Sequence, residues 1–131
     1  YIAHNGEINT LHGNLNWLRS NESSFFSPYF SKEELDMVLP VVTPGQSDSA
    51  CLDNVIELLT LSGRSLPHVM MMLIPEAWDG NDLMDPVKKA FYEFHAAIME
   101  AWDGPASISF TNGKMIGATL DRNGLRPSRY C

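Results

Sequence analysis

An alternating pattern of apolar and polar residues near the C-terminal end constrains the fold more than any other feature of the sequence. Residues 106–110 and 114–120 alternate, and Thr111-Asn112-Gly113 separates them. Asn-Gly between two alternating runs is the strongest short-range signal of a β-hairpin. Because a short strand and then helical patterns precede this hairpin, the order predicts an α+β or layered αβ fold with antiparallel strands, and not a parallel Rossmann sheet.

Helical patterns fill the sequence between an opening strand at residues 1–4 and the hairpin. Apolar residues three or four positions apart share one face of a helix, and Ser, Asp, Gly and Pro residues mark the ends. The first two expected helices cover residues 9–20 and 32–38. A third follows the candidate caps at 47–49 and stops at Gly63, a fourth starts at Ser65 and is broken by Pro75, and a fifth starts at the cap Asp85. The last has an apolar stripe made by Val87, Ala90, Phe91, Phe94, Ile98 and Ala101, with Gly104-Pro105 as its expected end.

The composition is that of a packed domain with an acidic balance. The 131 residues are 44% hydrophobic and carry a net charge of −7, which argues against nucleic acid or an anionic membrane as partner. The two cysteines, Cys51 and Cys131, are too few for a disulfide framework and indicate a reducing compartment. No apolar stretch has the length of a membrane span.

Both ends of the sequence fall inside expected strands. The chain opens at Tyr1 without a methionine, and a further strand is expected to begin at residues 129–131. We therefore expect a single partial domain, residues 1–131, truncated at both ends.

Asn5-Gly6 is the first candidate site. Asn-Gly often forms a simple turn, but here a strand enters and a helix leaves. Backbone N–H groups are free to point at a ligand in such a place. The Asn5 amide beside the Gly6 N–H would make a two-donor oxyanion hole.

Asp48 is the second candidate, at the start of the helix after Pro44-Gly45. It could cap that helix, as Ser47 or Ser49 could. Facing a pocket, its carboxylate could instead hold a substrate ammonium group.

The remaining polar motifs favour structural roles. His4, His12, His68 and His95 lack paired metal-ligand spacing, so neither a metal site nor a metal-dependent hydrolase is expected. The charged segment 121–127 is interpreted as a connection from the hairpin to a following strand.

Five segments together resemble the class II glutamine amidotransferase domain that opens the large subunit of glutamate synthases. They are residues 4–10 (HNGEINT), 13–17 (GNLNW), 45–49 (GQSDS), 71–78 (MMLIPEAW) and 120–130 (LDRNGLRPSRY). The resemblance implies part of a four-layer αββα N-terminal-nucleophile fold, with antiparallel sheets between helical layers. It also implies a mechanism, in which an N-terminal Cys attacks the side-chain amide of glutamine, ammonia leaves, and water releases glutamate.

Residue by residue, the resemblance assigns Asn5 and Gly6 to the oxyanion hole and Asp48 to the α-amino group of glutamine. The family's nucleophilic Cys and an arginine for the glutamine carboxylate belong upstream of Tyr1. Neither Cys51 nor Cys131 can replace an N-terminal Cys with its own free amine. The polypeptide as given is therefore expected not to hydrolyse glutamine by itself.

The resemblance further implies that ammonia passes to a synthase domain of the same polypeptide, where it combines with 2-oxoglutarate. FMN and an iron–sulfur cluster are expected there and not within residues 1–131. Electrons would come from a small electron-donating subunit or from ferredoxin. The expected location of the enzyme is the cytoplasm or, in some eukaryotes, a plastid. Two alternatives stay open: another class II amidotransferase, and a non-catalytic module that binds glutamine or a partner.

Overall fold

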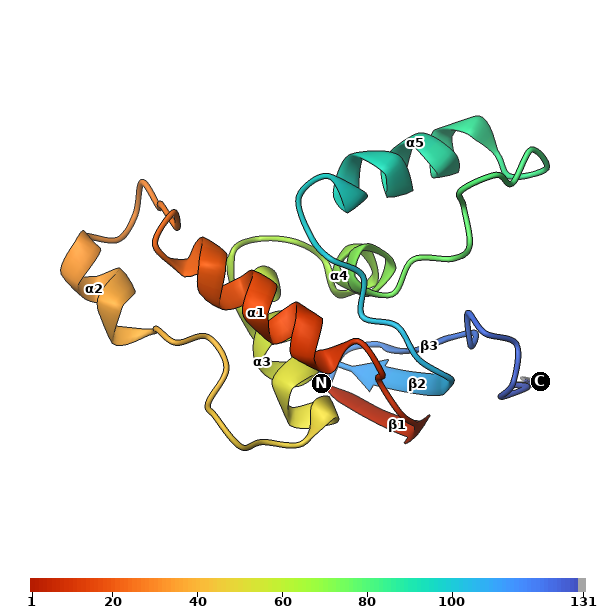
Figure 1. Cartoon of the computed structure of the whole chain (residues 1–131), viewed down its shortest axis with the longest axis horizontal. Coiled ribbons are helices and arrows are strands. Elements are labelled where there is room, and N and C mark those ends of the chain that lie inside the picture. The colour runs from red at the N-terminus through yellow and green to blue at the C-terminus, as the bar shows by residue number, and fades with distance from the viewer. Residues whose placement is uncertain (130–131) are drawn as a thin grey trace.

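The computed structural model describes residues 1–129, and Tyr130 and Cys131 lie outside the described residues. A strand comes first, five helices follow, and two further strands close the described chain (Figure 1). In order they are β1 (Ile2–Gly6), α1 (Leu11–Glu22), α2 (Lys32–Met37), α3 (Asp48–Leu61), α4 (Leu66–Leu73), α5 (Pro86–Ala96), β2 (Ala106–Thr111) and β3 (Ile116–Thr119). The expected order of strand, helices and hairpin is confirmed.

The three strands form one antiparallel sheet in the order β1-β2-β3. The hairpin of β2 and β3 pairs Thr111 with Ile116, so residues 112–115 form its loop. The Asn112 side chain accepts hydrogen bonds from the N–H groups of Lys114 and Met115, both at 3.1 Å. The strand β2 also pairs with β1, which joins the two ends of the described chain in one sheet.

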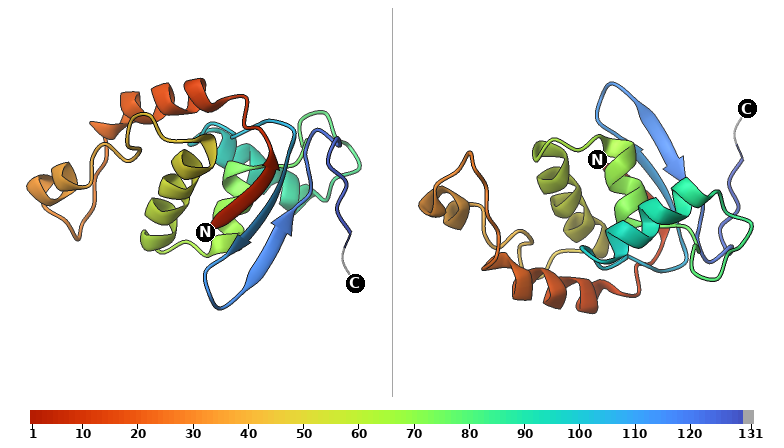
Figure 2. Two further views of the ribbon diagram at one scale, coloured as in Figure 1. Left: turned by 90° about the horizontal axis from the view of Figure 1, so that it is seen from below. Right: turned by 90° about the horizontal axis from the view of Figure 1, so that it is seen from above.

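Helices cover one face of this sheet and leave the other face bare. The helix α3 packs against α4 and β1, and α5 packs on α4 (Figure 2). The core between these elements is apolar; its most buried side chains include Leu52, Ile56, Leu66, Met70, Leu73 and Ile108. On the opposite face, Ala3, Ser109, Ile116 and Ala118 are exposed.

Local capping signals set most helix starts. The hydroxyl of Ser47 accepts the N–H of Ala50 at the start of α3, and Ser65 caps α4 in the same way. Asp85 accepts the N–H groups of Val87 and Lys88 at the start of α5, with Pro86 as its first residue. At the other end of α3, Gly63 has a φ of +99°, typical of a glycine that ends a helix.

The helix α5 is shorter than its apolar stripe predicts, and its buried face is different. It ends at Ala96 and buries Tyr92 and His95, whereas Val87 and Phe94 are 79% and 63% exposed. After Ala96 the chain leaves the helical path, because Trp102 packs into the core. The backbone N–H of Trp102 donates to the carbonyl of Leu73 at 2.7 Å. The expected helical end at Gly104-Pro105 was therefore wrong.

The helix α1 begins two residues later than expected, for a similar reason. The N–H of Thr10 donates to the carbonyl of Asp103 at 3.2 Å, which holds residue 10 outside the helix. Beyond α1, the chain between residues 23 and 40 makes an excursion from the rest of the molecule, with α2 away from the sheet (Figure 1). No helix within residues 1–129 is long and apolar enough to cross a membrane.

Candidate functional site

The end of β1 and the start of α3 meet at the candidate site. His4 Nε2 lies 3.2 Å from Asp48 Oδ1, and the N–H of Ile8 donates to Asp48 Oδ2 at 3.1 Å. These contacts hold Asp48 against the segment 4–8, which contains both Asn5 and Gly6. The structure therefore places Asp48 against the two residues, His4 and Ile8, that flank the segment of Asn5 and Gly6.

Asn5 and Gly6 form the last two positions of β1, opposite Ser107 and Ala106 of β2. The strand alternates, so that His4 is half-buried on the helix-covered side while Asn5 is exposed. The chain then turns toward α1, as expected for a strand that leads into a helix. An exposed amide at this point can donate a hydrogen bond to an incoming group.

Gly6 is required by its surroundings as well as by its backbone. Its φ is +130°, a value that side chains strongly disfavour. A Cβ atom at this position would lie 1.8 Å from the carbonyl oxygen of Pro105. Gly104 is equally confined, since its Cβ would lie 2.0 Å from the carbonyl oxygen of Glu7. The loop 104–105 therefore packs directly on the turn after β1.

Asp48 is not the cap of α3, because Ser47 fills that position. Its carboxylate accepts the N–H groups of Ile8 and Ser49, and His4 lies beside it. Burial raises the pKa of Asp48, but the hydrogen bonds from Ile8, Ser49 and His4 and the charge interaction with His4 outweigh it and lower the pKa below its ordinary value. An ionised carboxylate here can pair with an ammonium group.

The one cysteine among the described residues is unsuited to nucleophilic attack. Cys51 lies one turn after Asp48 in α3 and is 1% exposed. Burial, and then the charge of Asp48, raise the pKa of its thiol. Cys131 lies outside the described residues. The candidate site therefore contains donors and a carboxylate but no activated thiol among residues 1–129.

A polar network behind the site, not identified from the sequence, fixes the start of α1. Asn14 is buried, its Nδ2 donates to the carbonyl of Ala101 at 2.9 Å, and its Oδ1 accepts the Thr10 hydroxyl at 2.7 Å. The N–H of Asp103 donates to the same Thr10 hydroxyl at 2.9 Å. The signal in the sequence was a polar residue, Asn14, on the face of α1 that also carries Leu11 and Leu18.

The segment 121–127 is an ordered turn built around Asp121. This carboxylate is buried and accepts the N–H groups of Asn123, Leu125 and Arg126 at 2.9 to 3.0 Å. Arg122 pairs with Asp103 at 3.5 Å, which links the turn to the loop behind the site. This segment follows the hairpin, and the strand expected after it, at residues 129–131, extends outside the described residues.

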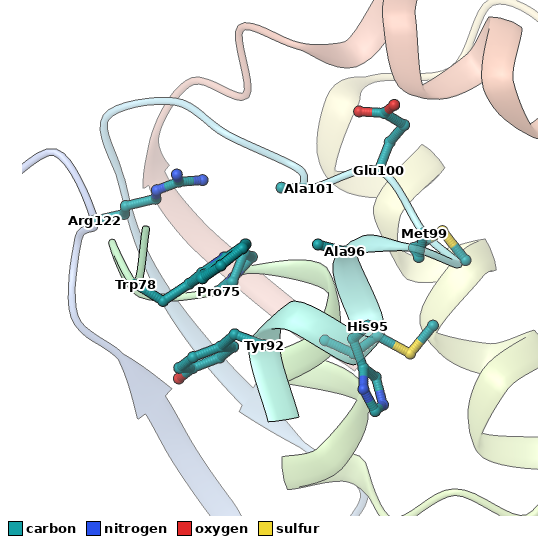
Figure 3. Close-up of a pocket in the computed structure, with 10 residues that line it drawn as sticks. Pro75, Trp78, Tyr92, His95, Ala96, Met99, Glu100, Ala101 and Arg122 are labelled. Carbon is teal, nitrogen blue, oxygen red and sulfur yellow. The ribbon is translucent and has the colours of Figure 1, made fainter. Parts of the chain in front are cut away.

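A separate cavity of about 160 Å³ opens between α5 and the segment 75–78. Trp78, Tyr92 and Arg122 line one part of it, and His95 and Met99 line another (Figure 3). A shallower groove of about 440 Å³ adjoins it beside β3. Neither contains Asn5, Gly6 or Asp48, so the candidate site lies at the surface and not in these hollows.

Two histidines meet between α4 and α5. Nε2 of His68 lies 2.6 Å from Nε2 of His95, and His95 Nδ1 lies 3.0 Å from the carbonyl oxygen of Phe91. His95 thus has hydrogen-bond partners on both ring nitrogens, which fits a structural role. Within residues 1–129 there is no group of three His, Cys, Asp or Glu side chains arranged to hold a metal ion.

Comparison with known proteins identifies the family. A family model described as glutamine amidotransferases class-II matches residues 1–131. The chain is 55% identical over 130 residues to the glutamate synthase (NADPH) large chain of Bacillus subtilis (strain 168), which covers 99% of this chain and 8% of the relative. It is 56% identical over 131 residues to glutamate synthase (NADH) of Saccharomyces cerevisiae, covering 99% of this chain and 6% of that one.

A plant glutamate synthase is also similar to this chain. The chain is 48% identical over 132 residues to the ferredoxin-dependent glutamate synthase, chloroplastic, of Oryza sativa subsp. japonica, covering 98% of this chain and 8% of the relative. The chain thus spans only 6% to 8% of the length of these relatives. With its whole length matched by the family model, the chain belongs to the class-II glutamine amidotransferases.

Proposed function

We propose that residues 1–131 are part of the glutaminase domain of a glutamate synthase, which hydrolyses glutamine to glutamate and ammonia for transfer to 2-oxoglutarate. The observation that carries this proposal is the contact of Asp48 with the segment 4–8. The pKa of Asp48 is lowered, and its carboxylate contacts His4 and Ile8, which flank Asn5 and Gly6 in a chain of this family; this supports the proposal. The names of the relatives, all glutamate synthases, support the choice of enzyme within the family.

In the proposed reaction, a Cys thiolate attacks the side-chain amide carbon of glutamine. The Asn5 amide and the Gly6 N–H stabilise the negative oxygen that forms, and Asp48 pairs with the α-ammonium group. The proton released by the thiol passes, through the α-amino group of the same Cys, to the leaving nitrogen. Collapse of the intermediate then expels ammonia and leaves a thioester, which water hydrolyses to glutamate and free thiol. Neither Cys51, which is buried with a raised thiol pKa, nor Cys131 carries the free N-terminal amine that the resemblance requires, so the nucleophile is assigned to a residue outside 1–131. The 131 residues alone are accordingly expected to be inactive.

The bare face of the sheet supports a layered fold in the complete domain. Ile116 is 90% exposed there, beside the small residues Ala3, Ser109 and Ala118. A second antiparallel sheet packed on this face, with its own helices beyond, would produce the four-layer αββα arrangement. Residues 1–131 are then one part of that domain.

The other parts of the reaction are assigned to the rest of the polypeptide. A synthase domain would use the ammonia, with FMN and an iron–sulfur cluster. Such a cluster is held by several thiolates, and residues 1–131 contain two cysteines, of which Cys51 is buried in α3. These residues therefore do not fit the cluster, and both groups are proposed to bind elsewhere in the polypeptide. The electron donor would be a small partner subunit or ferredoxin, in the cytoplasm or a plastid.

The test is glutamine-dependent ammonia release by the complete natural polypeptide that contains these residues. Replacing Asn5 by Ala should lower turnover on the order of a hundredfold, because one of two oxyanion donors is lost. Asn16→Ala is the matched control, since Asn16 is an exposed asparagine of α1 away from the site. It should retain the wild-type turnover, with circular dichroism showing that both variants are folded.

Other outcomes would redirect the interpretation. Unchanged turnover in Asn5→Ala would remove Asn5 from the oxyanion hole and return Asn5-Gly6 to the role of a turn. Absence of ammonia release from the wild-type polypeptide, at any glutamine concentration, would contradict the proposed reaction and favour a module that only binds glutamine or a partner.

A further inference from the structure

His4 connects the two halves of the candidate site. Its side chain is 8% exposed on the helix-covered side of β1, and its Nε2 atom lies 3.2 Å from Asp48 Oδ1. The next residue in the strand is Asn5. A single short stretch of β1 therefore contacts the carboxylate and carries the amide of the proposed oxyanion hole.

The contact identifies the ring nitrogen of His4 that faces Asp48. A carboxylate only accepts hydrogen bonds, so Nε2 is the donor to Asp48. The other ring nitrogen, Nδ1, is buried and has no hydrogen-bond partner within residues 1–129. His4 therefore orients the carboxylate of Asp48 through Nε2 alone.

The remaining donors to Asp48 come from the backbone. The N–H of Ser49 donates to Oδ1 at 2.7 Å, and the N–H of Ile8 donates to Oδ2 at 3.1 Å. Within the described chain, His4 is the side chain that fixes the rotation of this carboxylate. Its partial burial against α3 keeps the imidazole in place.

We infer that His4 is a positioning residue, which holds the Asp48 carboxylate in the orientation that pairs with the α-ammonium group of glutamine. This inference rests on the proposed function, because it needs Asp48 to bind the substrate. It assigns to His4 an effect on glutamine binding and not on the chemical step at the amide.

The test measures ammonia release by the complete polypeptide over a range of glutamine concentrations. His4→Phe keeps the ring and removes the donor, so KM for glutamine should rise roughly tenfold while kcat changes little. His4→Gln places an amide N–H near the position of Nε2 and should restore most of the affinity. His12→Phe is the matched control, because His12 is an exposed histidine of α1, and it should behave as wild type.

A second substrate separates positioning from a general structural effect. Glutaramate has the amide of glutamine but lacks the α-amino group, so it has nothing to pair with Asp48. His4→Phe and wild type should therefore release ammonia from glutaramate with equal kcat/KM. Equal losses on glutamine and glutaramate, or a fall in kcat with KM unchanged, would overturn the inference. A failure of His4→Gln to restore glutamine affinity, with His4→Phe impaired, would overturn it as well.

Comparison with the site variants shows which proposal has failed. In an Asp48→Asn background, adding His4→Phe should cost no further affinity, because the two residues act through one contact. If Asn5→Ala and Asp48→Asn both retain wild-type kinetics, the proposed function itself is wrong. If those two variants are impaired and His4→Phe is not, the role of His4 alone is wrong.

Discussion

Ser47 and Asp48, at the start of α3, are both candidate helix caps, but they have different roles in the structure. The hydroxyl of Ser47 accepts the N–H of Ala50 and caps the helix. Asp48 is therefore free to turn its carboxylate toward β1, where Ile8 and His4 contact it. The lowered pKa of Asp48 follows from these hydrogen bonds, which outweigh the effect of burial. One hydroxyl thus makes a charged residue available for a function.

Gly6 and Gly13 provide a matched test at the same scale. A Cβ at Gly6 would lie 1.8 Å from Pro105 O on a backbone with φ +130°, whereas a Cβ at Gly13 has no atom within 4 Å. Gly6→Ala should destabilise β1 by on the order of 3 kcal/mol, through backbone strain and displacement of Pro105. Gly13→Ala should stabilise α1 by about 1 kcal/mol, because alanine favours the helix.

Hydrogen exchange in the complete polypeptide measures both effects. Faster exchange of the β1 amides in Gly6→Ala and slower exchange of the α1 amides in Gly13→Ala are expected. Wild-type protection of β1 in Gly6→Ala would contradict the close approach of residues 6 and 105.

The helix α5 is held in place by contacts with its neighbours. Its buried residues are Tyr92 and His95, and His95 contacts both Phe91, whose ring centroid lies 4.2 Å away, and His68 of α4. Burial, then the neighbouring His68, and further Arg64, lower the pKa of His95 below its ordinary value of 6.5, despite the opposing hydrogen bond to Phe91. The helix is thus attached to α4 through a histidine that stays neutral while it is packed.

This attachment should depend on pH. Because the pKa of His95 is lower when α5 is packed, the open form binds more protons as the pH falls below 6.5. The contribution of His95 to the stability of the α4–α5 contact is therefore fully present above that pH and decreases below it. Exchange of the α5 amides, corrected for intrinsic rates, should accelerate at acid pH by up to about tenfold for each unit by which the pKa is lowered.

The variant His95→Phe removes the titrating group and should abolish this pH dependence. His12→Phe should preserve it, because His12 is exposed on α1. A pH dependence that persists unchanged in His95→Phe would assign the effect to another group.

For the whole molecule, the main feature is a sheet with one face covered and one face bare. The helices α3 and α4 shield the side that contains Ile108, while Ile116 on the other side is 90% exposed. Exposed apolar residues also gather on the excursion around α2, where Phe26 and Tyr29 are 86% and 87% exposed. The relatives are far longer than this chain, which spans 6% to 8% of their length.

A substitution on the bare face should have opposite effects in the isolated segment and in the complete polypeptide. Residues 1–131 expressed alone should bind a hydrophobic dye and self-associate, because uncovered sheet surfaces and edges recruit other chains. Ile116→Lys should reduce this association. In the complete polypeptide the same substitution should destabilise the domain, since the lysine would be buried beneath the proposed second sheet.

Sedimentation velocity and dye fluorescence compare the isolated segment with its variant, and thermal unfolding compares the complete polypeptides. Ser20→Lys, at an exposed position on α1, is the control and should change neither protein. A monodisperse isolated segment that binds no dye, together with a neutral Ile116→Lys in the complete polypeptide, would contradict a covered face.

The sequence by itself determined the features that depend on nearby residues. Ser65 and Asp85 start their helices as predicted, Ser47 is the one of three candidate caps that starts α3, and Asn112-Gly113 marks the hairpin. The reason is physical: caps and turns form hydrogen bonds within a few residues, so their chemistry is readable locally. The candidates Asn5, Gly6 and Asp48 were likewise visible as motifs.

Only the tertiary structure decided how these pieces meet. It places Asp48 against Ile8 and His4, packs Pro105 onto Gly6, and ends α5 at Ala96 where Trp102 enters the core. Each contact joins residues far apart in the chain, and the α5 stripe failed as a prediction for that reason. Apolar periodicity shows that a helix has a face to bury, but the neighbours that fold against it determine which face is buried and where the helix ends.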